Sequence, residues 1–214
     1  MRGLRENPGF AAGLLESGAP STVAPFALEK IFITAGQLLA DSFLLAERVH
    51  ASGFRPDLIV GVWRGGAPVA IAVQEYFDVR GCGARHVPVK TWAYRGIDER
   101  RGEVEVSGVA LVADSVDAVT RVLIVDDVFD TGSSVNALLG KLRFQLDERY
   151  PRDIRIACPW YKPKRNQTEI KPDYFLHETD AWLVFPHELS GLTPAEVAAG
   201  KPELQHILDK LHLG

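Results

Sequence analysis

The sequence predicts an α/β protein built on a mostly parallel, doubly wound sheet. Continuously apolar segments at 58–63, 121–125 and 154–158 have the length and composition of buried strands. Amphipathic stretches of helical length lie between them, and this alternation is typical of a parallel sheet covered by helices on both faces. The 214 residues contain 46% hydrophobic and 24% charged side chains. This is a globular composition that excludes a fibre, a coiled coil or a disordered chain.

Two amphipathic helices are predicted in the first half of the chain. Thr34 and Gln37 have the spacing of a capping box, so the first helix begins there and ends near Gly53. The second begins at Pro68, a residue that suits the first turn of a helix. The apolar stripes are Leu38, Leu39, Phe43, Leu45, Ala46 and Val49 in the first helix, and Val69, Ala72, Val73, Tyr76 and Phe77 in the second.

Further along the chain, strand and helix patterns alternate and then give way to a different kind of segment. Residues 86–94 are β-rich, and alternating polar and apolar residues at 103–106 indicate a hairpin arm. Short aromatic strands are expected near 174–176 and 182–185, and a capping box at 193–196 begins the C-terminal helices. The expected parts are an N-terminal arm at 1–28, one domain at 29–190 with a small hood subdomain at 161–190, and C-terminal helices at 191–214.

Charge and cysteine content restrict the partners and the compartment. The formal net charge is −4, whereas proteins that bind duplex nucleic acid nonspecifically are usually basic, so no nucleic-acid partner is expected. Cys82 and Cys158 are too few for a zinc site and read as reduced thiols. No apolar stretch reaches the roughly 18 residues of a membrane span, and the N-terminal segment lacks the pattern of a secretory signal. We therefore expect a cytoplasmic protein without a membrane partner.

The segment from Val122 to Ser134 carries the most informative chemistry. Its apolar strand ends in Asp126 and Asp127, and ligands bind beyond the carboxyl ends of strands in parallel sheets. The turn at 130–134 combines a glycine, three hydroxyl groups and a helix N-terminus, which together suit a phosphate group. Carboxylates beside such a turn can accept hydrogen bonds from a ribose diol or bind Mg²⁺. Each half alone is common in α/β proteins, but their combination indicates a site for a phosphorylated sugar.

A second glycine-containing turn, Arg64-Gly65-Gly66, follows the strand at 58–63. Two glycines before a helix allow a ligand to approach the backbone closely, and Arg64 can neutralise a phosphate. On its own, this pattern also fits an ordinary turn between a strand and a helix.

Together the two motifs resemble those of the type I phosphoribosyltransferases, whose signature for phosphoribosyl pyrophosphate (PRPP) is an apolar strand, two acids and an Asp-Thr-Gly turn. The resemblance covers about 34–190 and implies the fold of that family. It implies that Asp126 and Asp127 hold the ribose hydroxyls and the metal, and that the next turn binds the 5′-phosphate. The pyrophosphate would lie on the glycine turn, with a cis peptide bond between Trp63 and Arg64. The implied PRPP-binding residues are Arg64, Gly65, Gly66, Asp126, Asp127, Asp130, Thr131, Gly132, Ser133 and Ser134.

Two other segments resemble parts of the same enzymes. Residues 94–107 correspond to a mobile flap over the reacting centre, with Ala93-Tyr94 where purine enzymes often have Ser-Tyr; by composition alone this is a solvated loop. The stretches 161–163 and 180–188 are similar to the hood of xanthine–guanine and hypoxanthine–guanine phosphoribosyltransferases. There a lysine bonds the purine 6-oxo group, an aromatic residue stacks on the base, the next residue offers its carbonyl, and a later Asp helps to hold Mg²⁺. The matching residues are Lys162, Trp182, Leu183 and Glu188.

The resemblance implies a Mg²⁺-dependent enzyme of purine salvage. It would convert a 6-oxopurine (hypoxanthine, guanine or xanthine) and PRPP into the nucleoside 5′-monophosphate and pyrophosphate. Asp130 is the expected catalytic residue, since it can accept a proton from the purine imidazole ring. Asp127 and Glu188 are the implied metal ligands, and a homo-oligomer, dimer or tetramer, is expected. Two alternatives remain open, namely a phosphoribosyltransferase for another base, such as orotate, uracil or adenine, and a regulator that senses PRPP on the same fold.

Overall fold

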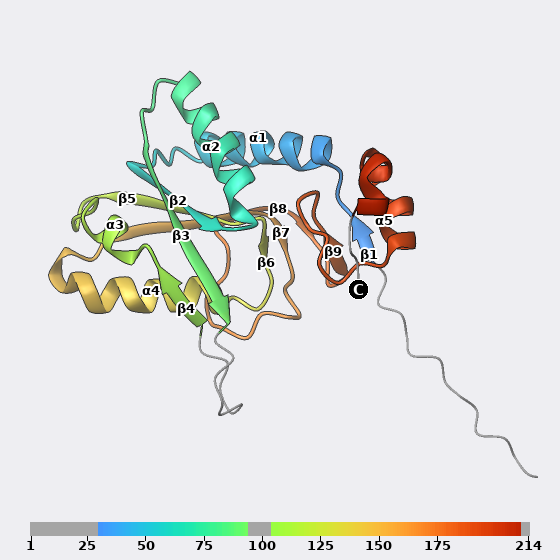
Figure 1. Ribbon diagram of the computed structural model, residues 1–214. Helices are drawn as coiled ribbons and strands as arrows, with labels where there is room; N and C mark the ends of the chain where they lie inside the picture. The colour runs from blue at the N-terminus through green and yellow to red at the C-terminus, as the bar shows by residue number, and fades with distance from the viewer. Residues whose placement is uncertain (1–29, 94–103, 211–214) are drawn as a thin grey trace, which may run out of the picture.

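The computed structural model describes residues 30–93 and 104–210. Its centre is a seven-stranded sheet with the strand order β4-β3-β2-β5-β7-β6, and β8 pairs with β7 beside this path (Figure 1). These pairs are parallel except for β3 with β4. The strands are β2 (Leu58–Trp63), β3 (Arg85–Ala93), β4 (Val104–Ser107), β5 (Arg121–Val125), β6 (Val128–Phe129), β7 (Asp153–Tyr161) and β8 (Tyr174–Glu178).

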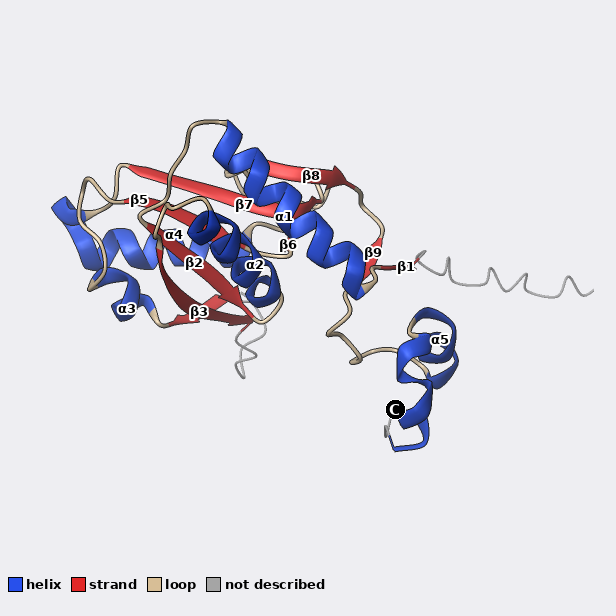
Figure 2. Ribbon diagram, turned by 90° about the horizontal axis from the view of Figure 1, so that it is seen from above, coloured by secondary structure: helices blue, strands red, loops and turns tan. Residues whose placement is uncertain are grey.

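Helices cover both faces of the sheet. α1 and α2 lie on one face, and α3 and α4 lie on the other (Figures 1 and 2). The central strands serve both layers because successive side chains point to opposite faces. In β5, Val122 and Ile124 share a buried cluster with α4, whereas Leu123 belongs to the cluster of α1 and α2. The predicted doubly wound α/β fold is thus confirmed. The helices are α1 (Ala35–Ala51), α2 (Gly66–Val79), α3 (Val109–Ala113), α4 (Ser133–Leu146) and the short 3-10 helix η1 (Asp147–Arg149).

A small lobe at one end of the sheet combines segments that are far apart in the sequence (Figure 1). We call residues 30–32 and 182–210 the terminal lobe. In it, β1 (Lys30–Phe32) pairs in parallel with β9 (Trp182–Val184), and α5 (Pro194–Gly200) and the 3-10 helix η2 (Pro202–Lys210) complete the unit. Its buried cluster is formed by Val184, Leu192 and Val197, with Phe32, Leu189, Leu204 and Leu208 packed against it.

The predicted hood at 161–190 is divided between these two units. β8 pairs with β7 and therefore belongs to the main sheet, whereas β9 pairs with β1 in the terminal lobe. The sequence does not reveal this division, because the partner of β9 lies at the opposite end of the described chain. The domain boundaries stay predictions, and the N-terminal arm at 1–28 lies outside the described residues. Within 30–93 and 104–210, no helix has the length and apolarity needed to cross a bilayer.

Most predicted elements are present, with small differences. The strands at 58–63 and 121–125 have the predicted bounds, and the capping box at Thr193 and Glu196 is formed. α2 begins at Gly66, two residues before the predicted start. At the start of α1, Thr34 accepts the backbone N–H of Gln37 at 3.1 Å. The elements that the sequence analysis missed are short, namely β1, α3, the two-residue strand β6 and the 3-10 helix η1.

The buried face of α1 differs from the predicted apolar stripe. Leu39 and Phe43 are exposed, whereas Asp41 and Ser42 are buried against the rest of the protein. Each polar side chain has a partner there, because Asp41 Oδ2 lies 3.0 Å from His177 Nε2 and the Ser42 hydroxyl donates to the Leu38 carbonyl at 2.6 Å. Satisfied polar groups can occupy a buried face at little cost, which is why hydrophobicity alone misplaced it.

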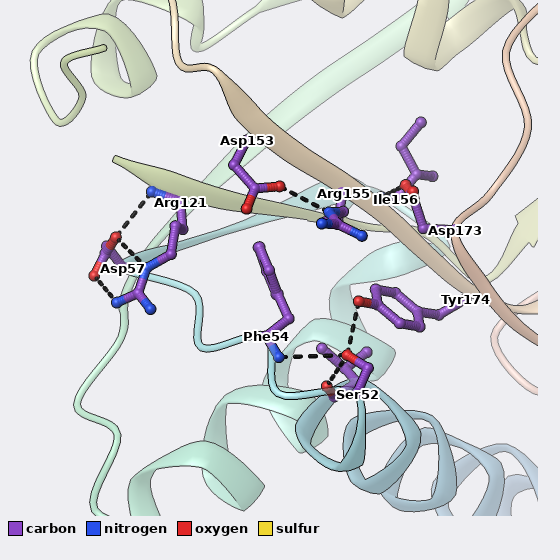
Figure 3. Close-up of polar contacts among 10 residues, drawn as sticks. Ser52, Phe54, Asp57, Arg121, Asp153, Arg155, Ile156, Asp173 and Tyr174 are labelled. Carbon is purple, nitrogen blue, oxygen red and sulfur yellow. Dashed lines mark hydrogen bonds and ion pairs between the residues drawn. The ribbon is translucent and has the colours of Figure 1, made fainter. Parts of the chain in front are cut away.

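Ion pairs and hydrogen bonds join the strands near their amino ends (Figure 3). The Asp57 carboxylate accepts hydrogen bonds from the Arg121 backbone N–H at 2.8 Å and from its guanidinium at 2.8 and 3.0 Å. These bonds with Arg121 hold the pKa of Asp57 below its usual value. Arg155 donates to Asp153 at 2.7 Å, and Asp173 accepts the backbone N–H of Ile156 at 2.8 Å. This edge of the sheet is therefore a set of matched charges.

Candidate active site

Two adjoining cavities lie at the carboxyl ends of the main strands, and the larger one also has residues of the terminal lobe in its wall. The larger has a volume of about 330 Å³ and the smaller about 210 Å³, and both include Asp127 and Asp130 in their walls. Predicted residues in the larger cavity are Arg64, Gly65, Asp127, Asp130, Lys162, Trp182, Leu183 and Glu188. Those in the smaller are Asp126, Asp127, Asp130, Thr131, Gly132 and Ser134.

Three predicted site residues are placed differently from this group. Gly66 is buried behind the cavity walls, and Ser133 lies in the same turn as the lining residues without lining either cavity itself. Tyr94, together with residues 95–103 of the predicted flap, lies outside the described residues. The remaining part of the flap is β4, which pairs with β3.

The paired acids and the glycine turn are in direct contact. A Cβ added to Gly65 would collide with the Asp127 carboxyl group, and one added to Gly66 would lie 2.6 Å from the Val125 carbonyl oxygen. The Asp127 backbone N–H donates to Asp126 Oδ1 at 3.0 Å. Any larger residue at either glycine would separate the two motifs, so the absence of side chains is what allows β2 and β5 to build one site.

Electrostatics at the paired acids disfavours two negative charges. Burial, and then the neighbouring Asp127 carboxylate, raise the pKa of Asp126 well above its usual value. A bound cation or a hydroxyl donor would relieve this repulsion. The paired acids therefore suit a ligand that has a diol or an associated metal ion. Without such a ligand, they do not stabilise the folded protein.

The glycine turn after β2 contains the cis peptide bond between Trp63 and Arg64, as predicted. Arg64 is exposed and lines the larger cavity together with Asp127. Its guanidinium is thus available to an anionic group bound against the turn.

The phosphate-type turn precedes α4. Gly132 has a φ of +78°, a conformation that favours glycine, and a Cβ there would lie 2.5 Å from Thr168 Oγ1. Thr131 Oγ1 accepts the Ser133 backbone N–H at 3.3 Å, and the Thr131 carbonyl accepts the N–H of Gln167 at 3.0 Å. The turn is therefore anchored to the loop after β7. It presents the first amides of a fourteen-residue helix to the smaller cavity.

Asp130 lies between two cations in the wall of the larger cavity. Lys162 Nζ donates to Asp130 Oδ2 at 3.1 Å, and Arg165 Nε lies 2.7 Å from Oδ1 as an ion pair. Lys162 is only 5% exposed. Its backbone N–H donates to the Phe129 carbonyl at 2.9 Å, and this bond fixes the end of β7 beside the acid turn. Sequence reasoning found Lys162 but missed Arg165, although the basic run after β7 marks the region.

The terminal lobe supplies the opposite wall. Trp182 is 47% exposed and lines the cavity, so its ring has a free face. His187 stacks on Phe185, with ring centroids 5.8 Å apart and an angle of 13° between the planes, and its Nε2 lies 3.5 Å from Asp127 Oδ2. Glu188 Oε2 accepts the Phe185 backbone N–H at 3.0 Å. No paired spacing in the sequence singles out His187, because its neighbour Asp127 follows the distant strand β5.

The carboxylates fit a magnesium ion that brings other ligands with it. Within 30–93 and 104–210, no group of three or more His, Cys, Asp or Glu residues is arranged to hold a metal. Asp127 and Glu188 nevertheless line the same cavity. Mg²⁺ commonly binds through one or two carboxylates, with water and substrate phosphates as the other ligands. The two residues thus fit an ion that arrives with a phosphate compound, and their role as ligands stays a prediction.

Comparison with known proteins gives consistent results. A family model described as the phosphoribosyl transferase domain matches residues 34–190, well over half of the chain. A purine phosphoribosyltransferase structure from Pyrococcus horikoshii OT3 shares 28% sequence identity with a TM-score of 0.58, over 77% of this chain and 97% of that one. Two further structures show the same fold at lower identity. No curated protein matches the sequence.

The first of these two is a hypothetical protein from Neisseria gonorrhoeae with bound ppGpp, at 20% identity and a TM-score of 0.64, covering 76% of this chain and 90% of that one. The second is a xanthine-guanine-hypoxanthine phosphoribosyltransferase from Helicobacter pylori, at 21% identity and a TM-score of 0.54, covering 73% and 92%. Each is similar to this chain in its fold.

Proposed function

The chain belongs to the phosphoribosyl transferase domain family, and on that premise we propose that it transfers the 5-phosphoribosyl group of PRPP to a 6-oxopurine. The acceptor is hypoxanthine, guanine or xanthine, and the products are the nucleoside 5′-monophosphate and pyrophosphate. The similarity to a purine phosphoribosyltransferase at 28% identity supports the choice of a purine over other bases.

The observation that carries this proposal is the pairing of Lys162 with Asp130 in the cavity wall. The ammonium and carboxylate are 3.1 Å apart, so a hydrogen-bond donor stands directly beside an acceptor. One edge of a 6-oxopurine has the complementary pattern, with an acceptor oxygen at the 6-position beside an imidazole nitrogen that carries a proton. Adenine presents an amine donor to the ammonium instead. The pair therefore favours 6-oxopurines over 6-aminopurines.

The remaining groups divide between the ribose and its phosphates. The amides and hydroxyls of the turn at 131–134 bind the 5′-phosphate at the N-terminus of α4. Asp126 and Asp127 accept hydrogen bonds from the ribose diol, and Arg64 with the Gly65–Gly66 turn binds the pyrophosphate. Trp182 stacks on the base, and the Leu183 carbonyl accepts a hydrogen bond from it.

Reaction at the ribose breaks the bond from C1 to the pyrophosphate oxygen and forms a bond from C1 to a purine nitrogen. Positive charge develops at C1, so the anionic groups near the ribose and the cations near the pyrophosphate stabilise the transition state. Asp130 accepts the proton that the purine imidazole ring loses. Asp127 and Glu188 would hold Mg²⁺, which would neutralise charge on the departing pyrophosphate.

Steady-state turnover of a panel of bases with PRPP and Mg²⁺ tests the proposal. The panel is hypoxanthine, guanine, xanthine, adenine, orotate and uracil, with nucleotide formation measured by chromatography. We expect turnover of at least one 6-oxopurine and an efficiency for adenine lower by about 10⁴-fold, since the wrong base would leave a buried polar group unpaired. A preference for adenine or a pyrimidine would overturn the acceptor assignment. Binding of PRPP without turnover of any base would favour a regulator.

A further inference from the structure

Lys201, at the end of α5, is a fully buried lysine that none of the proposed steps uses. It is only 2% exposed. Lysine is rarely buried to this extent, because removing an ammonium group from water carries a high cost. Burial lowers the pKa of Lys201 for the same reason. A methionine or leucine would fill similar space without this cost, so the contacts made by the ammonium are what the lysine adds.

Those contacts are with two successive backbone carbonyls beside the active cavity. Lys201 Nζ donates to the Phe185 carbonyl at 2.6 Å and to the Pro186 carbonyl at 3.1 Å. These two residues follow β9 directly and lead to His187 and Glu188. The ammonium therefore determines the point at which the chain leaves the strand that carries Trp182.

Phe185 connects this point to the cavity through three separate interactions. Its ring lines the cavity and stacks on His187, and its backbone N–H donates to Glu188 Oε2 at 3.0 Å. Its carbonyl, which Lys201 holds, also accepts the Glu188 backbone N–H at 3.0 Å. A shift of Phe185 would thus move an aromatic wall, an imidazole and a carboxylate of the cavity together.

Lys201 is itself held firmly by the terminal lobe. Its backbone N–H closes α5 by donating to the Val197 carbonyl at 2.8 Å. The other end of α5 is fixed by a capping box and by an ion pair of 2.6 Å between Lys30 and Glu196. Lys201 also lies beyond residue 190, where the match to the family model ends. The segment after the matched domain therefore reaches back to the cavity.

We propose that Lys201 is a positioning residue for the acceptor base, acting through the Phe185 and Pro186 carbonyls on the cavity wall formed by 182–188. The inference rests on the proposed function, since it assigns this wall to the base. PRPP depends less on Lys201, because the residues assigned to it directly lie on the main sheet at 64–66 and 126–134. Only Glu188 of this wall would reach PRPP, through Mg²⁺, so both Michaelis constants are measured at saturating Mg²⁺. A residue needed only for folding would change the amount of active protein and leave both Michaelis constants unaltered.

The test compares the Lys201→Met and Lys201→Gln variants with the parent. Lys30→Met is the matched control, because it also removes an ammonium group from the terminal lobe. The Lys30 ammonium contacts Gly191 and Glu196 and does not contact the carbonyls at 185 and 186. Michaelis constants for the best base and for PRPP are measured separately, together with melting temperatures. We expect the KM for the base to rise about tenfold or more in Lys201→Met. The KM for PRPP should stay within about threefold of the parent, and Lys201→Gln should recover part of the loss through its amide donor.

Three outcomes would overturn the inference. The first is equal changes in the two Michaelis constants, and the second is no change in either. The third is that both Lys201 variants fail to fold while Lys30→Met folds, which would make Lys201 a structural residue. If the parent itself turns over no purine, the proposed function fails and the inference fails with it. If the parent is active and the Lys201→Met variant has the same Michaelis constants, only the inference about Lys201 is contradicted.

Discussion

The two ends of the central sheet use charged residues in opposite ways. At the amino ends, Asp57 accepts three hydrogen bonds from Arg121, and opposite charges are matched along the edge (Figure 3). At the carboxyl ends, the carboxyl groups of Asp126 and Asp127 lie side by side, and burial, followed by the neighbouring Asp127, raises the pKa of Asp126. Charges of the first kind stabilise the fold, whereas charges of the second kind cost stability and are useful only to a ligand. Substitutions at the two ends should therefore have opposite signatures.

The largest effect is expected for Asp130→Asn. This change keeps the size of the side chain and removes the proton acceptor, so turnover should fall roughly 10²–10⁴-fold, far more than the loss of the ion pairs with Lys162 and Arg165 would reduce the folded fraction. Initial rates at saturating base and PRPP provide the measurement. Asp57→Asn is the matched control at the other end of the sheet and should retain full turnover. Turnover of Asp130→Asn within threefold of the parent would refute the role of Asp130.

Lys162→Ala is expected to reduce the efficiency with 6-oxopurines by about 10²-fold, because the buried donor for the 6-oxo group is lost. Binding of PRPP, measured by calorimetry, should be nearly unchanged. Lys164→Ala is the matched control, since the Lys164 side chain is 86% exposed and its ammonium lies 3.4 Å from the Asp180 carboxylate. If Lys162→Ala and Lys164→Ala behave alike, the base lies elsewhere.

Trp182→Ala should raise the KM for every accepted base by a similar factor of roughly ten, because stacking does not depend on the substituent at the 6-position. Trp92→Ala removes another exposed tryptophan, one outside both cavities, and should leave these constants unaltered. A loss confined to one base would show that Trp182 reads the 6-position rather than the ring face.

Asp57→Asn should act on stability alone. Allowing for solvent screening of this partly exposed pair, we expect a loss of about 1 kcal/mol, or a melting temperature lower by roughly 2–4 °C at pH 7. The folded-state pKa of Asp57 lies below its usual value of 3.8. The stabilisation is therefore present above that value and is lost as the pH falls through the folded-state pKa. Melting curves of both proteins should converge in acid, and a difference that persists there would contradict the charge pairing.

The main sheet could be predicted from the sequence because its strands are local patterns. The apolar runs at 58–63 and 121–125 need no information from elsewhere, and the glycine turn after the first and the acids after the second reach the same edge in any parallel sheet. The contact between Gly65 and Asp127 depends in addition on β2 and β5 being neighbours, an order that was not predicted. The predicted cis peptide bond depended instead on the family resemblance.

The terminal lobe could not be predicted in the same way, because its order depends on contacts between distant residues. β1 is three residues long and acquires its structure only by pairing with β9. The positions of Arg165 beside Asp130 and of His187 beside Asp127 likewise depend on how separate elements pack. Lys201 is buried in the structure, and no pattern in the sequence marks it. Such residues are visible only once the fold is known.

The most direct test of the contrast between the two ends is a calorimetric titration of PRPP in the presence of Mg²⁺. It is carried out on the parent and on the Asp127→Asn and Asp57→Asn variants, which make the same chemical change at opposite ends of the sheet. We predict that the parent and Asp57→Asn bind PRPP equally well and that Asp127→Asn binds it about tenfold or more weakly. Equal affinity in all three proteins would contradict the account, because the ligand would then bind away from the paired acids.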